Sequence, residues 1–260
     1  ETDYTDREQE DEPAAQESSQ PDNTVPLYIN GALHSDCLVV DGTARMSLGR
    51  FATLAGLSFD GHAIGGVVPE LGENGDYAVV NGRYFYLPDG LYEMGGELLW
   101  PLTVLAKMFD CTVTWDAASG SIDLDLTDVA LLSDGETYYN QQDVYWLSRI
   151  IYAESGNQSL EGQMAVGNVV LNRLASPRYP DTVYDVIFDK NGGVQFEPVS
   201  NGTVYMEPTA SSVQAAKLAL WGVNVAGESM YFFNPALSKG TWIVNNRTYH
   251  TTIGAHRFYV

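Results

Sequence analysis

The sequence has few basic residues and no long apolar run. Its 260 residues contain 13 Lys and Arg against 34 Asp and Glu, which gives a formal net charge of −21. Nucleic-acid binding requires clusters of Lys and Arg that displace counterions from phosphates, and the chain has no such cluster. No stretch approaches the ~20 apolar residues that a membrane-spanning helix needs. We therefore expect no nucleic-acid partner and no insertion into a membrane.

Cysteines and the common catalytic motifs are also scarce. Cys37 and Cys111 are too few for a disulfide scaffold, and they could form one bridge or remain two buried thiols. The chain lacks a Gly-rich phosphate loop, a His-Glu-x-x-His pair, a Cys-x-x-Cys pair and a Gly-x-Ser-x-Gly elbow. These absences leave nucleotide, zinc and serine-hydrolase chemistry without support, so we expect no cofactor and no metal.

The negative charge is unevenly distributed along the chain. Residues 1–26 carry nine carboxylates against one arginine, residues 27–136 carry sixteen against four basic residues, and residues 137–260 carry nine against eight. An acidic surface repels an anionic polymer, so the C-terminal half is the part that can approach one. The sequence begins at Glu1 without an apolar leader, and we expect a processed, secreted protein.

Composition and turn signals divide the chain into domains. Residues 1–25 are polar and acidic, which predicts a disordered spacer. Residues 26–126 contain short strands, Asn-Gly turns at positions 30–31 and 81–82, and two brief helices. The pattern repeats after about 50 residues, so we interpret this region as a small duplicated strand-rich α/β domain.

The Asn-Gly turns and the segments WPLTVLAKMF and VTWDAASGSIDL carry a family resemblance in residues 26–126. They resemble the copper amine oxidase N-terminal-like domain of secreted Gram-positive wall proteins. The two histidines of this region, His34 and His62, have no spacing that would chelate a metal, so we expect no copper site. The resemblance implies a spacer or adhesive module.

After a linker at 127–142, the hydrophobic period becomes helical. Val144, Leu147 and Ile151 share one face, which predicts a helix that ends near Gly156. Further helices are expected at 160–174 and 211–221, and loops or short strands at 230–234, 241–244 and 257–259. We therefore expect an α+β protein in which residues 143–260 form a mainly helical domain.

Glu154 is the candidate catalytic residue of this domain. It lies at the C-terminal end of a hydrophobic helix, where the helix dipole and apolar neighbours disfavour a charged carboxylate and raise its pKa. A carboxylic acid that stays protonated near neutral pH is what glycosidic bond cleavage requires. A solvated glutamate at a frayed helix end explains the same local sequence, so this pattern alone leaves both interpretations open.

Several segments, in order along the chain, favour the catalytic interpretation. They are LSRIIYAESGNQSLEGQMAVGNVVLNRLASPRYPDTVYDVIF, MYFFNP, KGTWI and IGAHRFY. These segments resemble the cell-wall hydrolase family of spore cortex-lytic enzymes (SleB-type), a lysozyme-like family similar in fold to goose-type lysozymes and lytic transglycosylases. The resemblance implies that the Glu of Tyr-Ala-Glu, which is Glu154 here, is the catalytic acid.

The resemblance also implies a saccharide groove. Tyr231 and Asn234 of the Tyr-x-x-Asn-Pro element would line it unless they simply pack the core, and Trp242 beyond them could offer a flat platform to a sugar ring. Gln195 lies in the long loop at 192–203, which is a candidate groove wall. Glu161 could support the site or simply complement the dipole at the start of its helix.

We predict a monomeric lytic transglycosylase that cuts the β-1,4 bond between N-acetylmuramic acid and N-acetylglucosamine in peptidoglycan glycan strands. Glu154 would protonate the leaving oxygen and then take the proton of the muramyl C6 hydroxyl, whose oxygen closes onto C1. One alternative is a lysozyme-type hydrolase in which Glu161, Asp181 or Asp185 activates water. Another is a non-catalytic cell-wall-binding protein, because a fold alone does not establish activity. For His256 we expect a buried, hydrogen-bonded side chain.

Overall fold

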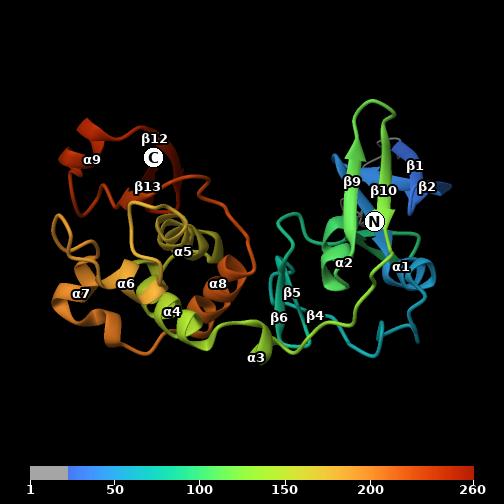
Figure 1. Ribbon diagram of the computed structural model, residues 1–260, viewed down its shortest axis with the longest axis horizontal. Helices are drawn as coiled ribbons and strands as arrows, with labels where there is room; N and C mark the ends of the chain where they lie inside the picture. The colour runs from blue at the N-terminus through green and yellow to red at the C-terminus, as the bar shows by residue number, and fades with distance from the viewer. Residues whose placement is uncertain (1–22) are drawn as a thin grey trace, which may run out of the picture.

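The structure is a computed structural model that describes residues 23–260. It contains a strand-rich and a mainly helical domain, joined by a segment around helix α3 (Figure 1). The spacer expected over residues 1–25 lies outside the described residues, except that positions 23–25 belong to the first strand and so are not part of a spacer. Within 23–260, no helix has the length and apolar character needed to cross a membrane.

The N-terminal domain is built on a seven-stranded sheet with the order β7-β8-β3-β2-β1-β10-β9. Its strands are β1 (Asn23–Ile29), β2 (Ala32–Val40), β3 (Thr43–Ser47), β7 (Tyr92–Met94), β8 (Glu97–Pro101), β9 (Thr112–Asp116) and β10 (Ser121–Asp125). Strands β1 and β10 are parallel, and the other neighbours are antiparallel. Helices α1 (Leu48–Ala55) and α2 (Leu102–Met108) pack with the sheet around a core in which Phe51 and Phe109 stack.

Cap and turn residues set the limits of these elements. Ser47 Oγ accepts a hydrogen bond from the backbone N–H of Arg50, and Gly56 ends α1 with a φ of 66°. Asn30 and Asn81 have φ values of 51° and 50°, as the Asn-Gly hairpin turns require. The helix and the two turns expected from the sequence are confirmed.

Two hairpin–helix units lie side by side in the sheet. Strands β2 and β3 with α1 form one unit, strands β7 and β8 with α2 form the other, and β3 pairs with β8. The two Asn-Gly hairpins are not equivalent, because β1 and β2 belong to the large sheet whereas β5 (Tyr77–Val80) and β6 (Arg83–Tyr86) join β4 (Glu70–Leu71) in a separate one. The two turns therefore do not mark equivalent copies, and the duplication expected from the sequence stays a prediction.

The linker expected over 127–142 is packed against the β4–β6 sheet. It contains the short helix α3 (Gly135–Tyr138). The N–H of Gly135 donates to the carbonyl of Asn81 at 2.9 Å, and the N–H of Tyr84 donates to the hydroxyl of Tyr139 at 3.0 Å. The Tyr139 side chain is buried. The connection between the domains is therefore fixed by hydrogen bonds and burial.

The C-terminal domain is mainly helical, as expected, and has one small sheet. Its helices are α4 (Gln141–Ser155), α5 (Leu160–Leu174), α6 (Val183–Phe188), α7 (Glu197–Asn201), the 3-10 helix η1 (Thr203–Tyr205), α8 (Ala210–Leu220) and α9 (Thr241–Asn246). Strands β11 (Tyr231–Phe233), β12 (Tyr249–Ile253) and β13 (His256–Tyr259) pair in the order β11-β13-β12. The helix expected at 160–174 is confirmed. The expectation of a loop or strand at 241–244 is wrong, because these residues lie in α9.

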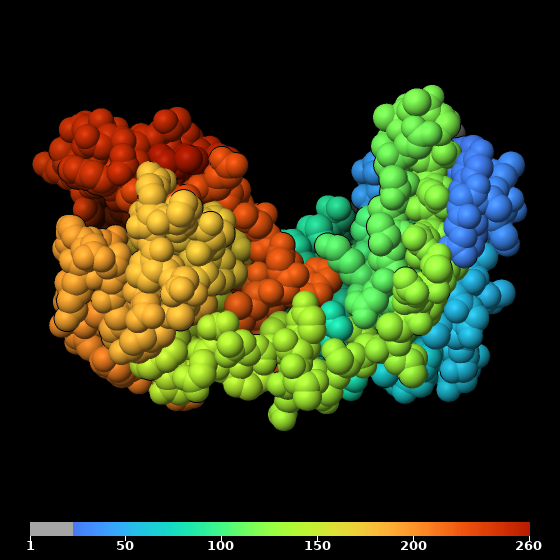
Figure 2. All heavy atoms as spheres, in the orientation of Figure 1, coloured from blue at the N-terminus to red at the C-terminus, as the bar shows by residue number. Residues whose placement is uncertain are grey.

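The domains contact each other through α8 and the β4–β6 sheet. Trp221, directly after α8, packs edge-on against Phe85 with ring centroids 5.0 Å apart. Lys107 Nζ lies 4.7 Å from the centroid of the Trp221 ring, and Lys217 Nζ lies 5.2 Å from that of Tyr84. Figure 2 shows the domains in contact in the lower part of the view and diverging above it. The contact is therefore made by aromatic rings and two lysines at one edge of each domain.

Neither cysteine is paired in the structure. Cys37 is buried and Cys111 is half-buried, and both are free thiols. Of the alternatives that the sequence leaves open, the structure thus shows free thiols, one of them fully buried. Among residues 23–260, no group of three or more His, Cys, Asp or Glu side chains is arranged to hold a metal ion.

Candidate functional site

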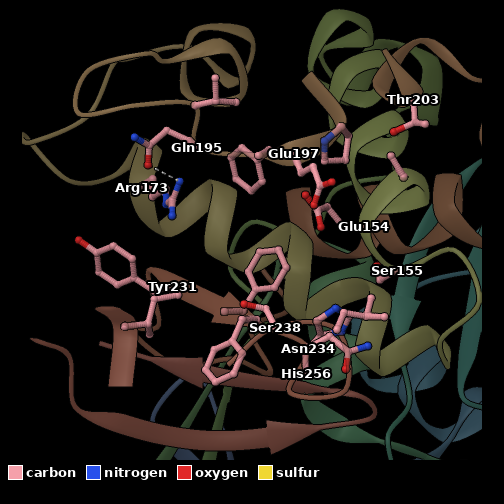
Figure 3. A pocket seen from close by; sticks show the side chains of 18 of the residues that line it. Glu154, Ser155, Arg173, Gln195, Glu197, Thr203, Tyr231, Asn234, Ser238 and His256 are labelled. Carbon is pink, nitrogen blue, oxygen red and sulfur yellow. Dashed lines mark hydrogen bonds between the residues drawn. The ribbon is translucent and has the colours of Figure 1, made fainter. Parts of the chain in front are cut away.

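An open groove of about 1550 Å³ crosses the C-terminal domain. The end of α4, the segment at 189–198, strand β11 and helix α9 border it. Figure 3 shows side chains from the first three of these pointing into it. Every residue that lines the groove belongs to the C-terminal domain. Helices α7 and α9 lie on the side of that domain away from the N-terminal domain (Figure 1), so the N-terminal domain does not cover the groove.

Glu154 lies in the last turn of α4 and lines the groove. The helix ends directly after it, where the N–H of Gly156 donates to the carbonyl of Tyr152. A Cβ atom on Gly156 would lie 2.6 Å from Tyr152 Cδ2, so a larger residue could not form this turn without displacing the tyrosine. The helix end is therefore packed rather than frayed, and Glu154 has a defined position.

Buried amides hold the turn that follows Glu154. Gln158 Oε1 accepts the N–H of Ala255 at 2.9 Å, which ties the turn to the β12–β13 connection. Gln163 Nε2 donates to the Gln158 carbonyl at 3.0 Å, and Gln163 Oε1 accepts from the Ser212 hydroxyl at 2.7 Å. Gln163 and Ser212 are both buried, where hydrogen bonds are stronger than in water. Residues from α5, α8 and the small sheet thus position the end of α4.

The surroundings of Glu154 favour its protonated form. Burial, and next the negative charge of Glu197, raise the pKa of Glu154 to about 7, while the positive charge of Arg173 acts in the opposite direction. Figure 3 shows the carboxyl groups of Glu154 and Glu197 pointing toward one another. The sequence predicts the direction of this shift, and the structure adds burial within the groove and a second carboxylate as its causes. With such a pKa, about half of the Glu154 side chains hold a proton at neutral pH.

Sequence reasoning missed Glu197. It is the first residue of α7, is followed by Pro198, and lines the groove. A glutamate at the start of a helix is already explained by the helix dipole, so the local pattern gives no reason to connect it with Glu154. Only the fold brings the start of α7 opposite the end of α4.

Tyr179, Tyr231 and Arg247 are joined by hydrogen bonds at one end of the groove, and the guanidinium of Arg173 lies over both tyrosine rings. The Arg173 side chain is 4% exposed, and its Nε donates to the carbonyl of Met230 at 2.8 Å. The Tyr231 hydroxyl accepts from the Tyr179 hydroxyl at 3.1 Å and from Arg247 Nη2 at 3.0 Å. Burial acts to raise the pKa of Tyr231, but these bonds and the two arginine charges outweigh it and lower the pKa. Tyr231 is thus a fixed polar group of the groove and not a core aromatic.

Four of the five predicted substrate-binding residues line the groove: Tyr231, Asn234, Gln195 and Trp242. Gln195 Oε1 accepts a hydrogen bond from Arg173 Nη1 at 3.3 Å, while its amide nitrogen donates to carbonyls within its own loop. The Trp242 side chain is 57% exposed and so can offer a ring face to a ligand.

Glu161 is the predicted site residue that the fold places elsewhere. It is exposed in the first turn of α5 and does not line the groove. Burial, followed by the negative charge of Glu161, raises the pKa of Tyr86, which belongs to the N-terminal domain. Asp181 and Asp185, the other residues considered for activating water, are also exposed and outside the groove. For Glu161, the reason is the helix break after Glu154, which lets α5 leave in a new direction.

His256 is buried, as expected, but its hydrogen bonding differs from the expectation. Its side chain is 5% exposed and lies edge-on to Phe232, with ring centroids 5.3 Å apart. In the described part of the chain, its Nδ1 atom has no hydrogen-bond partner. Burial lowers the pKa of His256, because it disfavours the charged form of the ring.

The C-terminal domain has known relatives. Residues 157–259 match the model of the Cell Wall Hydrolase family. A spore cortex-lytic enzyme of Oceanobacillus iheyensis is 36% identical over 120 residues, which are 46% of this chain and 42% of that protein. The spore cortex-lytic enzyme of Bacillus subtilis is 34% identical over 120 residues, 46% of this chain and 38% of that protein. The catalytic domain of the germination-specific lytic transglycosylase SleB from Bacillus anthracis is 34% identical, with a TM-score of 0.43 over 47% of this chain and 97% of that one.

The family match lies entirely within the C-terminal domain. The chain covers less than half the length of the two curated relatives described above, and the N-terminal domain lies outside the family match. The family match begins at Asn157, directly after the helix end that carries Glu154, and includes Arg173, Glu197 and Tyr231. Residues 157–259 of this chain are thus similar to the Cell Wall Hydrolase family, and the chain is similar in sequence to part of the spore cortex-lytic enzymes.

Proposed function

We propose that the C-terminal domain is a peptidoglycan-cleaving glycosidase whose acid is Glu154. The observation that carries this proposal is a carboxylic acid with a pKa of about 7 on the wall of an open groove. Glycoside cleavage needs an acid that is still protonated at the working pH. The match to the Cell Wall Hydrolase family and to relatives named for lysis of spore cortex supports a cell-wall glycan as the substrate.

The proposed reaction is lytic transglycosylation at the β-1,4 bond between N-acetylmuramic acid and N-acetylglucosamine. Glu154 donates its proton to the glycosidic oxygen as the bond from that oxygen to C1 breaks. The Glu154 carboxylate then takes the proton of the muramyl C6 hydroxyl, whose oxygen bonds to C1 and closes a 1,6-anhydro ring. Glu154 ends the cycle protonated, so one carboxyl group suffices and water is not consumed.

The groove offers groups that would orient the sugar. Trp242 presents a ring face, and its ring centroid lies 6.0 Å from that of Tyr231. Asn234 Oδ1 accepts the N–H of Ala236 at 2.9 Å, which fixes the side chain. Among the described residues the Asn234 amide nitrogen has no hydrogen-bond partner, and we propose that it donates to the carbonyl of a 2-acetamido group.

Hydrolysis is the second candidate reaction, and Glu197 is the observation that favours it. A hydrolase that inverts the anomeric centre needs a second carboxylate to activate water. Glu197 lies beside Glu154 on the same side of the groove, whereas the candidates from the sequence do not line it. In this mechanism Glu197 takes the proton of the attacking water while Glu154 protonates the leaving oxygen.

Product analysis separates these possibilities. We would digest purified peptidoglycan, from cortex and from vegetative wall, with the wild-type chain and with Glu154→Gln, and identify products by mass spectrometry. Anhydro-muropeptides from the wild type alone support transglycosylation by Glu154, and reducing-end products from the wild type alone support hydrolysis. Equal cleavage by both proteins would remove Glu154 from the mechanism. Binding to sacculi without cleavage by either protein would indicate a non-catalytic wall-binding protein.

The remaining parts of the proposal concern the whole chain. We propose that it acts outside the cytoplasm, because its substrate would be the cell wall. We also propose that it acts as a monomer. The N-terminal domain would serve as a spacer or adhesive module, as its resemblance to the copper amine oxidase N-terminal-like domain implies. Its position away from the groove supports a role other than chemistry.

A further inference from the structure

Three arginine side chains gather at one end of the groove, and we call them the arginine cluster. Arg173 comes from α5, Arg178 from the turn after α5, and Arg247 from the residue that ends α9; all three line the groove. They surround the start of β11: Arg173 and Arg178 contact Met230, and Arg247 contacts Tyr231. Figure 3 shows Arg173 and Tyr231 on one side of the groove and Glu154 with Glu197 on the other.

No carboxylate forms an ion pair with the arginine cluster in the described part of the chain. Within 23–260, the ion pair with a nitrogen–oxygen distance below 4.0 Å joins Arg149 to Glu207, and both residues lie outside the groove. Asp189 also lines the groove, and its charge acts on Arg173, but its Oδ1 atom accepts the N–H of Asn191 at 2.8 Å. A chain with 34 acidic and 13 basic residues has an ample supply of partners for arginine, so three arginines without an ion pair at one site are unexpected.

Aromatic rings and hydrogen bonds hold these guanidinium groups in place. The Arg247 guanidinium carbon lies 4.5 Å from the ring centroid of Tyr231 and 4.7 Å from that of Trp242. Arg247 Nε is buried and has no hydrogen-bond partner among residues 23–260. Arg173 is stacked at 5.0 Å from the ring centroid of Phe196. A planar guanidinium fixed in this way is suited to bind a carboxylate through two parallel hydrogen bonds.

We infer that the arginine cluster is a subsite for a carboxylate of the substrate, separate from the position of the bond that is cut. This inference rests on the proposed function, because it names a feature of the same glycan. In peptidoglycan, such carboxylates belong to the stem peptide or to the free lactyl group of a muramyl residue without a peptide. A muramic lactam residue has neither group. The subsite therefore binds those muramyl residues of a strand that keep a carboxylate.

Binding measured without cleavage tests the inference. The full chain with Glu154→Gln is titrated with one neutral probe and two charged probes. The neutral probe is chitotetraose, and the charged probes are the muramyl tetrasaccharide with free lactyl carboxylates and the same tetrasaccharide with stem peptides. We expect at least one charged probe to bind about tenfold more tightly than chitotetraose. Arg247→Gln and Arg178→Gln should each remove most of that difference. The control is Arg257→Gln, because Arg257 is exposed and lies outside the groove. This variant makes the same change of charge and should leave the difference in affinity unchanged.

The source of the carboxylate follows from which charged probe gains affinity. Preference for the peptide-free tetrasaccharide points to the lactyl carboxylate, and preference for the peptide-bearing one points to the stem. Arg247→Lys should recover part of the affinity, because it keeps the charge but not the planar fork. If Arg247 had only a packing role, its replacement would weaken the binding of all three probes equally.

Failure of this inference and failure of the proposed function give different results. If wild type cleaves peptidoglycan but the three probes bind equally, or the charged probes do not bind, the subsite is wrong and the proposed function stands. If the charged probes bind more tightly and the arginine variants lose this preference, the subsite stands even where no cleavage is observed.

Discussion

Three aspartates of the N-terminal domain and Glu154 of the C-terminal domain are held in opposite ways. In the N-terminal domain, Asp60, Asp116 and Asp125 are exposed, the latter two at the ends of β9 and β10, and hydrogen bonds from neighbouring backbone N–H and hydroxyl groups lower their pKa. In the described part of the chain, the Glu154 side chain accepts no such bond, and burial together with the charge of Glu197 raises its pKa to about 7. Donors stabilise the charged form and burial destabilises it. These three aspartates thus stabilise the folded structure, whereas the raised pKa of Glu154 keeps this group protonated and able to donate its proton.

The largest effect expected from this difference is loss of cleavage in Glu154→Gln. Glutamine cannot donate a proton to the leaving oxygen, and general acid catalysis contributes about 10²–10⁴ in rate. We expect the rate of turbidity loss of purified peptidoglycan to fall by about 10³ or more. The matched control is Glu161→Gln, the same chemical change on the exposed start of α5, which should retain wild-type activity. Loss of activity in the control alone would reverse the assignment of the two glutamates.

A second prediction concerns the pH dependence of cleavage. The acid must be protonated, so kcat/KM should fall as the pH rises through about 7, the pKa of Glu154. Glu197→Gln removes a like charge and should move this fall toward lower pH, which reduces the rate at pH 7 by roughly two- to fivefold. Initial rates between pH 5 and pH 9 would show the displacement, and Glu228→Gln, exposed and outside the groove, should show none.

The same experiment distinguishes the two roles possible for Glu197. If it activates water, Glu197→Gln should lower the rate at every pH by about 10² or more and abolish reducing-end products. If it acts only through its charge, the maximal rate at low pH should be retained. A pH profile identical to that of the wild type would show that Glu197 does neither.

The third prediction is that Glu154→Gln stabilises the folded protein at high pH. The pKa of Glu154 is about 7 in the folded state, above its value in an unfolded chain, so the unfolded state loses this proton first as pH rises. The wild type therefore loses stability between about pH 4.5 and about pH 7, and the glutamine variant does not. Allowing for the part of the side chain that water reaches, we expect a gain of about 1–2 kcal/mol at pH 8 and almost none at pH 4. Urea unfolding at both pH values would measure it, and an equal gain at both would point to packing instead of charge.

These predictions depend on residues that the sequence revealed unequally. The helix end at Glu154 follows from local signals, namely an apolar period that stops at a glycine, and the structure places it as expected. Glu197 and the arginine cluster could not be connected with Glu154, because they come from separate elements that only tertiary packing brings together. Local propensity also misled at 241–244: Thr, Trp, Ile and Val favour a strand, but the N–H of Val244 donates to the carbonyl of Gly240 and continues a helical turn. In the N-terminal domain, the Asn-Gly turns predicted hairpins correctly but not the sheet that each hairpin joins.

The smallest effect is expected for Asp125→Asn in the N-terminal domain. The hydroxyl and N–H of Thr127 donate to the Asp125 carboxylate and lower its pKa, so this group stabilises the folded state above its unfolded pKa and the benefit disappears as pH falls through the folded value. Because the side chain is exposed, the variant should have a slightly lower urea midpoint at pH 7 and unchanged cleavage. The difference in midpoint should shrink toward the lowest pH at which the protein stays folded. An equal loss at pH 7 and at that lowest pH would mean that the neutral turn geometry matters and not the charge. A loss of cleavage would break the comparison itself, because it would show that a carboxylate of the N-terminal domain takes part in the chemistry.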